Sequence, residues 1–201
     1  IKSIVKKNRK LDVVGIQENV DCDVMHGVPE FSRMRMINCQ IGKTPILTFL
    51  NPDIKVLGFA WDSFYYERKK GRPFHIIVAE YQGQDFMFIN CHFPHINQGD
   101  IEKTIIEKLT FTLTCKYCGY IIPDKDMGNT KFDVTPHYNT KTNKTEYTKL
   151  NGIRFEPVSI QPLLEKKDFH VVMLGDFNDH NTIFLHRGFI PFNTRINRDL
   201  K

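Results

Sequence analysis

The chain contains 201 residues, of which 41% are hydrophobic and 25% are charged, an ordinary balance for a globular protein with a sizeable core. Its formal net charge of +5 favours an anionic partner, such as nucleic acid, a phosphoinositide or an anionic membrane surface. No run of about 18 apolar residues occurs, so the sequence excludes a helix that spans a membrane.

The first part of the chain is expected to hold one helix, one strand and a long loop. Residues 1–10 place apolar residues at helical spacing among lysines, which is typical of the last turns of an amphipathic helix. Residues 11–16 are rich in β-branched residues and predict a short buried strand that ends at Gln17 and Glu18. Residues 19–45 show no clean period and contain glycine and proline, so we expect a long loop with a short element inside it.

The middle of the chain predicts two hairpins. The apolar runs 46–50 and 54–60 are separated by Asn-Pro-Asp, a turn sequence that is typical of a hairpin. The runs 74–81 and 85–93 flank Gln-Gly-Gln and indicate a second hairpin more clearly. Alternation along its second strand predicts one shared face for Phe86, Phe88, Asn90 and His92.

The last part of the chain combines helices, a polar segment and a strand. Residues 100–113 repeat an apolar residue at every fourth position, which predicts a helix with Asp100 as its N-cap. Residues 115–150 are rich in Lys, Thr, Asn and Asp, so we expect a polar surface insertion within a single domain of residues 1–201. A weaker helix is expected near 157–166, followed by a strand at 169–174.

The cysteines predict a protein without a disulfide framework. There are five, an odd number spread widely, which favours a reducing, intracellular compartment such as the cytoplasm or nucleus. Cys115 and Cys118 have the spacing of half a zinc knuckle. The other half is missing, because His137 is the only nearby candidate besides carboxylates.

Glu18 follows an apolar strand and offers a hard oxygen ligand that suits Mg²⁺ or Mn²⁺ together with water and substrate phosphate. Taken alone, such a glutamate is more often a helix cap or a solvated loop residue. Two further predicted strands also end in polar residues, one at Asn90-Cys91-His92 and one at Gly175-Asp176-Phe177-Asn178. Three polar strand ends of this kind predict one assembled phosphate site.

The second and third strand ends carry complementary chemistry. The imidazole of His92 can donate to a phosphate oxygen or move a proton near neutral pH, while His95 is as typical of a phosphate contact as of a surface residue. Asp176 and Asn178 share a face of an extended chain and could orient a water molecule and hold a phosphate oxygen. A plain β-turn is the alternative for this last sequence. His75, on the preceding strand, is expected to be structural.

Four motifs in order resemble the endonuclease/exonuclease/phosphatase superfamily. They are Asp-Val-Val-Gly-Ile-Gln-Glu at 12–18, Gly-Arg-Pro at 71–73, Asn-Cys-His at 90–92 and Gly-Asp-Phe-Asn at 175–178. The superfamily includes deoxyribonuclease-I-like nucleases, abasic-site endonucleases, neutral sphingomyelinases and inositol-polyphosphate 5-phosphatases. The resemblance extends from about residue 1 to 190, interrupted by the polar segment.

This resemblance implies a four-layered α/β sandwich, in which two packed mixed β-sheets are flanked by helices. It implies Glu18 and Asp176 as metal ligands for Mg²⁺ or Mn²⁺. The same resemblance assigns catalytic roles to His92, Asp176 and Asn178. Substrate-binding roles are expected for Arg72, Asn90 and His95.

Two features of the superfamily are not found in this chain. Its members usually begin with a strand that bears an asparagine, and they usually finish with a strand that carries an Asp-His pair. Asp179-His180 directly follows the third strand end and is too close to form that separate strand. We therefore expect a fragment that lacks both terminal strands, with low stability and little activity.

The function that this sequence predicts is a divalent-metal-dependent phosphoester hydrolase. A phosphodiesterase acting on nucleic acid, an endo- or exonuclease, is favoured by the positive charge and by the lysine-rich segment at 141–149. A phosphoinositide or sphingolipid phosphoesterase is the alternative within the same chemistry. From another class, the chain could be a non-catalytic module that binds nucleic acid or a protein.

Overall fold

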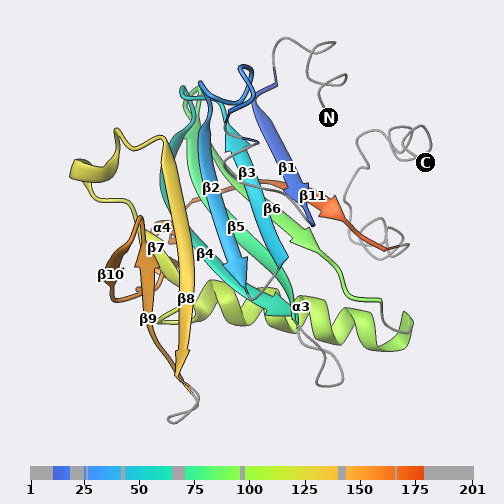
Figure 1. The fold of residues 1–201 in the computed structure, drawn as a ribbon. Helices are drawn as coiled ribbons and strands as arrows, with labels where there is room; N and C mark the ends of the chain where they lie inside the picture. The colour runs from blue at the N-terminus through green and yellow to red at the C-terminus, as the bar shows by residue number, and fades with distance from the viewer. Residues whose placement is uncertain are drawn as a thin grey trace.

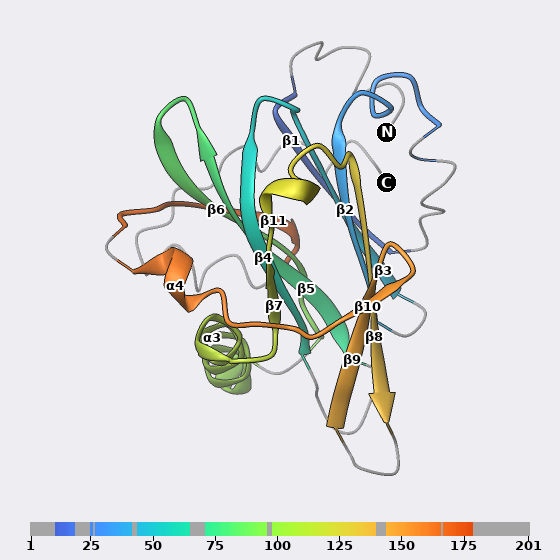
Figure 2. The same cartoon turned by 90° about the vertical axis from the view of Figure 1, so that its left-hand side faces the viewer.

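The computed structural model describes residues 11–18, 25, 27–41, 44–64, 71–95, 98–139, 144–165 and 167–178. Within them, two β-sheets pack face to face (Figures 1 and 2). One sheet has six strands in the order β1-β3-β2-β8-β9-β10, and the other has five in the order β11-β6-β5-β4-β7. The expected helix at 1–10 and the tail after residue 178 lie outside the described residues.

The six-stranded sheet is mixed, because β2 and β8 run parallel while its other neighbouring strands are antiparallel. Its strands are β1 (Val13–Gln17), β2 (Arg35–Ile41), β3 (Thr44–Leu50), β8 (Lys131–Asn139), β9 (Lys144–Leu150) and β10 (Ile153–Phe155). The short element expected inside the loop over 19–45 is β2, which the structure shows to be an interior strand of this sheet. Local periodicity did not identify it as a strand, because interior strands are covered on both faces and need not alternate.

The five-stranded sheet is also mixed, because β11 runs parallel to β6 and the remaining pairs are antiparallel. Its strands are β4 (Lys55–Phe64), β5 (Arg72–Tyr81), β6 (Gln84–His92), β7 (Gly119–Ile121) and β11 (His170–Asp176). The hairpin of β5 and β6 confirms the second predicted hairpin. Gln82 and Gly83 form its turn with φ of 51° and 76°, the left-handed pair that matches strand twist in a two-residue loop.

The first predicted hairpin was wrong, because its two runs belong to different sheets. The earlier run is β3, which pairs with β1 and β2, whereas the later run is β4, which pairs with β5 and β7. The Asn-Pro-Asp turn therefore passes the chain from one sheet to the other. A turn sequence predicts a reversal of direction, but it does not fix which strand becomes the partner.

The segment predicted as a surface insertion contributes to both sheets. Within 115–150, β7 pairs with β4, while β8 and β9 extend the six-stranded sheet beyond β2. The short 3-10 helix η1 (Asp124–Asp126) connects these strands. A central strand is thus built from a polar stretch, and the division of the chain into domains stays a prediction.

Helices cover one outer face of the sandwich. The helix α3 (Gln98–Thr114) lies on the five-stranded sheet (Figure 2). Its Ile105 belongs to the same buried hydrophobic cluster as Phe64 and Ile76 of that sheet. It begins two residues before Asp100, so this residue is not the N-cap that was expected. The weaker helix is a single turn, α4 (Gln161–Leu164).

The outer face of the six-stranded sheet is covered by the turns around residues 27–34. Phe31 is fully buried and stacks on Phe49 of β3 with ring centroids 4.4 Å apart. The described layers confirm the α/β sandwich with two packed mixed sheets. Among the described residues, no helix is long and apolar enough to cross a membrane.

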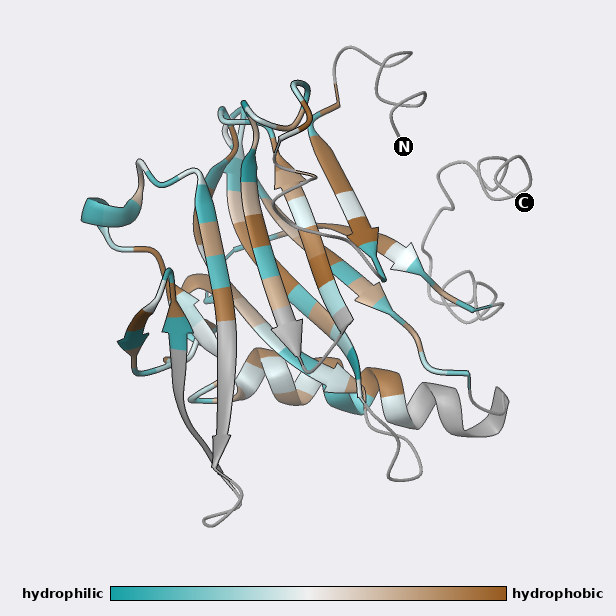
Figure 3. Cartoon of the chain, in the orientation of Figure 1, coloured by the Kyte–Doolittle hydropathy of each residue, from teal (hydrophilic) through white to brown (hydrophobic). Residues whose placement is uncertain are grey.

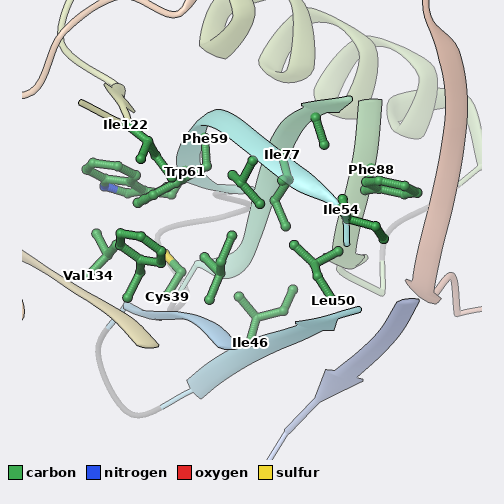
Figure 4. Packing of buried hydrophobic residues seen from close by; sticks show 14 of the residues in the cluster. Cys39, Ile46, Leu50, Ile54, Phe59, Trp61, Ile77, Phe88, Ile122 and Val134 are labelled. Carbon is green, nitrogen blue, oxygen red and sulfur yellow. The ribbon is translucent and has the colours of Figure 1, made fainter. Parts of the chain in front are cut away.

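The main hydrophobic core lies between the two sheets (Figure 4). Phe59, Ile77 and Leu50 have no exposed surface there, and burial of each such side chain contributes about 2 kcal/mol. Figure 3 shows hydrophobic residues interrupted by polar ones along the strands, as expected where one face is buried. Polar residues enter this interior at one end, and that end carries the predicted site.

Cys115 and Cys118, three positions apart, form a disulfide, although the sequence predicted a protein without a disulfide framework. Paired sulfurs cannot act as zinc thiolates, and the pair weakens the argument for a reducing compartment. Cys39 and Cys91 are buried free thiols, and Cys22 lies outside the described residues. His137 lies on β8, where only the backbone is described.

Candidate phosphoester site

Glu18 stands at the end of β1, where the chain leaves the six-stranded sheet. Its Oε1 accepts a hydrogen bond from Arg72 Nη1 at 3.1 Å and lies 3.5 Å from His92 Nε2. Arg72 begins β5 and His92 ends β6, so both partners come from the opposite sheet. Two sheets thus converge on one half-exposed carboxylate.

His92 is held as a neutral imidazole in this arrangement. Its side chain is only 2% exposed, and Arg72 Nη1 lies 3.5 Å from Nδ1. Burial lowers the pKa of His92 below 6.5 and Arg72 lowers it further, which outweighs the opposite effect of Glu18 and Asp176. Because the guanidinium can only donate, Nδ1 is the acceptor and Nε2 carries the proton that faces Glu18.

Asp176 is brought to the same rim by the parallel pairing of β11 with β6, in which it lies opposite His92. Its backbone oxygen accepts from Phe93 N at 2.9 Å. Gly175 allows this approach, since a Cβ there would lie 1.8 Å from the backbone oxygen of Cys91. The glycine of the Gly-Asp-Phe-Asn motif is therefore required by packing.

Asn178 is fixed beside Asp176 by two hydrogen bonds. Its backbone N–H donates to Asp176 Oδ1 at 3.0 Å, and its side-chain Nδ2 donates to Phe93 O. The first of these bonds is the local pattern of an Asx turn, so the turn that was the alternative reading is present. The turn and the chemistry are compatible, because the turn is what presents both side chains at the rim.

Backbone strain marks two of these residues. Four described non-glycine residues have positive φ, and two of them, Gln82 and Asn151, directly precede a glycine in a tight turn. The other two are Glu18 at 61° and Asn178 at 45°. Left-handed backbone at a glutamate costs about 1 kcal/mol and is typical of positions where a side chain must be aimed.

Asn90 does not reach the rim, which corrects its expected role as a substrate contact. It is fully buried between the sheets, where its Nδ2 donates to Leu47 O at 2.7 Å and to Thr48 Oγ1 at 2.9 Å. Its Oδ1 accepts from Gln17 Nε2. With these bonds made inside the protein, the carboxamide has no free N–H for a phosphate.

His95 is exposed and lies three residues after the end of β6, near enough to His92 for its charge to act on that ring. The structure thus brings together five predicted residues, and we call them the rim cluster: Glu18, Arg72, His92, Asp176 and Asn178. His95 stands beside this cluster with no direct contact in the described residues. Its substrate role stays a prediction.

The residues at the rim suit the coordination that Mg²⁺ commonly has in proteins. Mg²⁺ is commonly held by one or two carboxylates, with water and substrate phosphate completing the shell, and Glu18 and Asp176 offer that number. No group of three or more His, Cys, Asp or Glu side chains forms a cage within the described part of the chain. This donor set fits Mg²⁺ or Mn²⁺ and does not fit a closed structural zinc site.

Three residues beneath the rim had no predicted role of their own at the site. Gln17 and Thr48 hydrogen-bond Asn90, and His75 hydrogen-bonds Thr48. His75 was expected to be structural, and its burial agrees with that expectation. Gln17 was named with Glu18 as the end of the first strand, whereas Thr48 carries no local signal because its partners come from the other sheet.

No family model matches the sequence, and no curated protein matches it. Solved structures with a similar arrangement include truncated TDP2 from Caenorhabditis elegans, with 16% identity, a TM-score of 0.39 and coverage of 54% of this chain and 43% of that chain. TDP2 from D. rerio, complexed with single strand DNA product, has 14% identity, a TM-score of 0.42 and coverage of 66% and 49%.

ANGEL2, described as a 2′,3′-cyclic phosphatase and solved with adenosine-2′,3′-vanadate, has 12% identity, a TM-score of 0.41 and coverage of 67% and 42%. The chain spans less than half the length of each of these three solved chains. Similarity at this level carries no argument about activity. The two packed mixed sheets agree with the fold that the four sequence motifs imply.

Proposed function

We propose that this chain carries the site of a divalent-metal-dependent phosphoester hydrolase, a phosphodiesterase that acts on nucleic acid. The observation that supports it most is the meeting of Glu18, Arg72 and His92, with Asp176 in register beside them. Carboxylates, a guanidinium and a neutral imidazole at one half-exposed edge are the groups that in-line phosphoryl transfer uses.

Arg72 and His92 bind the phosphate in this proposal. The guanidinium neutralises phosphate charge and offers several N–H donors in a planar fork. The proton on Nε2 of His92 donates to a phosphate oxygen, since that nitrogen already faces the exposed side of Glu18. Both donors are in place before substrate arrives, so little reorganisation is needed as charge develops.

Asp176 orients the attacking water and Asn178 holds a second phosphate oxygen. The hydrogen bonds from Asn178 to Asp176 and Phe93 fix their relative positions. A Mg²⁺ ion held by Glu18, with Asp176 as the second ligand, would supply charge neutralisation at the phosphate. Arg72, whose Nη1 lies 3.1 Å from Glu18 Oε1, would remain the cationic donor for the phosphate.

Nucleic acid is the proposed substrate because of the net charge of +5. A phosphoinositide or sphingolipid head group would be held by the same phosphate chemistry. A non-catalytic binding module is the rival of another class. It would keep the basic character of the chain without needing the neutral imidazole of His92 or the left-handed Glu18.

The test is hydrolysis of bis-p-nitrophenyl phosphate, DNA, RNA and phosphoinositides by the chain together with the terminal strands that the superfamily resemblance implies, with Mg²⁺ and with excess chelator. Turnover that requires Mg²⁺ and is lost in Glu18→Gln supports the proposal. Glu156→Gln, at an exposed glutamate after β10, is the matched control and should keep full turnover. Turnover that survives chelator or Glu18→Gln would contradict the mechanism. Binding of DNA without hydrolysis under all conditions would favour the binding module.

A further inference from the structure

A group of polar side chains lies between the two sheets, directly beneath the rim cluster. It comprises Gln17 of β1, Thr48 of β3, His75 of β5 and Asn90 of β6, and we call it the inter-sheet polar cluster. Thr48, His75 and Asn90 have no exposed surface. Polar groups in such a place are costly unless they are hydrogen-bonded, so their bonds show what the cluster holds in place.

Asn90 is the centre of this cluster and binds both strands of the opposite sheet that lie nearest to it. It donates to Leu47 O at 2.7 Å and to Thr48 Oγ1 at 2.9 Å, both on β3, and it accepts from Gln17 Nε2 on β1. Turning the carboxamide over would set its oxygen against Leu47 O, so only one orientation satisfies these partners. The bonds therefore fix β6 relative to β1 and β3.

Thr48 extends the cluster to a second strand of the five-stranded sheet. Its hydroxyl also hydrogen-bonds Nε2 of His75, which lies opposite Asn90 in the antiparallel pair of β5 and β6. Burial lowers the pKa of His75 from 6.5 to about 3, so this ring is neutral and adds no buried charge. One hydroxyl on β3 thus joins the six-stranded sheet to two neighbouring strands of the other sheet.

Gly15 gives Asn90 the room that this arrangement needs. A Cβ at this position would lie 3.0 Å from Asn90 Cγ and Oδ1, which is tighter than ordinary contact. Gly15 is paired with Thr48 in the register of β1 and β3, so the glycine and the hydroxyl face the same carboxamide. The backbone of β1 can then approach β6 closely just before Glu18.

Two members of the cluster are close in sequence to two members of the rim cluster. Gln17 directly precedes Glu18, and Asn90 lies two residues before His92 on the same face of β6. We propose that Thr48 and Asn90 are positioning residues, which set the separation of Glu18 and His92 by fixing β1 against β6. The kinetic test of this inference depends on the proposed function. The geometry is argued from the hydrogen bonds alone.

The test removes the shared hydroxyl with little change of shape, in Thr48→Val. Its matched control is Thr112→Val on α3, because Thr112 is also a fully buried threonine with a hydroxyl bonded to protein, at Lys108 O. Displacement of reacting groups by a fraction of an ångström should lower kcat by about tenfold or more in Thr48→Val, with KM within about twofold. Thr112→Val should lower the melting temperature and leave kcat unchanged, and Thr48→Ser should restore kcat.

A second measurement does not depend on hydrolysis. The ring ¹⁵N resonances of His92, assigned with a His92→Gln variant, report the contacts of that imidazole with Arg72 and Glu18. They should shift in Thr48→Val and stay unchanged in Thr112→Val. Unchanged resonances in Thr48→Val overturn the positioning role, as does wild-type kcat in that variant or an equal loss in Thr112→Val. If the wild-type domain with its terminal strands hydrolyses nothing, the proposed function fails while the resonances still decide the positioning role.

Discussion

The rim cluster and the inter-sheet polar cluster share strands β1, β5 and β6 but differ in what their polar groups face. At the rim, Glu18 is half exposed and left-handed, and its carboxylate meets charges from the other sheet. Beneath it, Asn90 is buried and its polar atoms are satisfied by neighbouring strands. The first arrangement costs stability and exposes reactive groups, whereas the second contributes stability and exposes nothing. Adjacent residues on one strand can therefore serve chemistry and architecture separately.

The largest expected effect is on activity, from Glu18→Gln at the rim. Loss of the carboxylate should lower kcat for bis-p-nitrophenyl phosphate by about 10³-fold, since charge at the metal position and contact with His92 are both lost. The urea midpoint should stay near that of the wild type, because exposed ion pairs contribute little. A large loss of stability in this variant would erase the distinction between the two clusters.

The next largest effect is on stability, from Asn90→Leu beneath the rim. This substitution leaves Leu47 O and Thr48 Oγ1 buried without their donor, so the free energy of unfolding should fall by about 3 kcal/mol. Urea denaturation measures it. Asn38→Leu is the control, since buried Asn38 donates one hydrogen bond, to Asp133, and should cost about 1 kcal/mol. Equal losses in the two variants would contradict the special role of Asn90.

The dependence of stability on pH should sharpen the comparison further. The folded chain holds His75 neutral with a pKa of about 3, while the unfolded chain protonates it below about 6.5. Its contribution is therefore complete above pH 6.5 and is lost as the pH falls toward 3, by up to about 1.4 kcal/mol per pH unit.

Urea denaturation at about pH 7 and pH 5 measures this slope. His75→Gln should reduce the slope without removing it, because the lowered pKa of His92 acts in the same direction. A slope as steep as that of the wild type in His75→Gln would show that another group is responsible.

The smallest expected effect is a gain of stability at the rim. In Glu18→Gly the left-handed φ of 61° no longer carries a side-chain penalty, so unfolding should cost up to about 1 kcal/mol more. Glu18→Ala, which loses the same carboxylate but keeps the strain, is the control and should show no gain. Both variants lack the carboxylate and should be inactive. A difference in stability between them, measured by calorimetry, therefore reports the backbone strain at this residue alone.

The local parts of the fold could be predicted from sequence, and the non-local parts could not. The hairpin of β5 and β6 follows from alternation around Gln82 and Gly83, and α3 follows from its apolar spacing. By contrast, β2 and β8 form a parallel pair that the sequence of neither strand indicates, and β8 lies in a polar segment. Strand pairing is decided by burial against partners that are remote in the chain.

The same division holds for the candidate site. Glu18, His92 and Asp176 were predicted because each ends a strand with a side chain suited to phosphate chemistry. Asn90 was placed wrongly, since its polar character indicated the rim while its register placed it beneath the opposite sheet. Sequence shows which groups are present, but only tertiary contact shows which of them are already satisfied.

The parallel pairing of β11 with β6 has a consequence for folding order. His170 lies opposite Phe86, and a strand formed so late in the chain must close a long loop before it gains any contact. The β5–β6 hairpin, with its two-residue turn, forms in about 1–10 μs, so β6 is available for pairing before β11 reaches it. Asp176 and Asn178 then arrive last. During synthesis, Glu18, Arg72 and His92 would therefore be in place well before Asp176, and the rim cluster would be complete only when β11 docks.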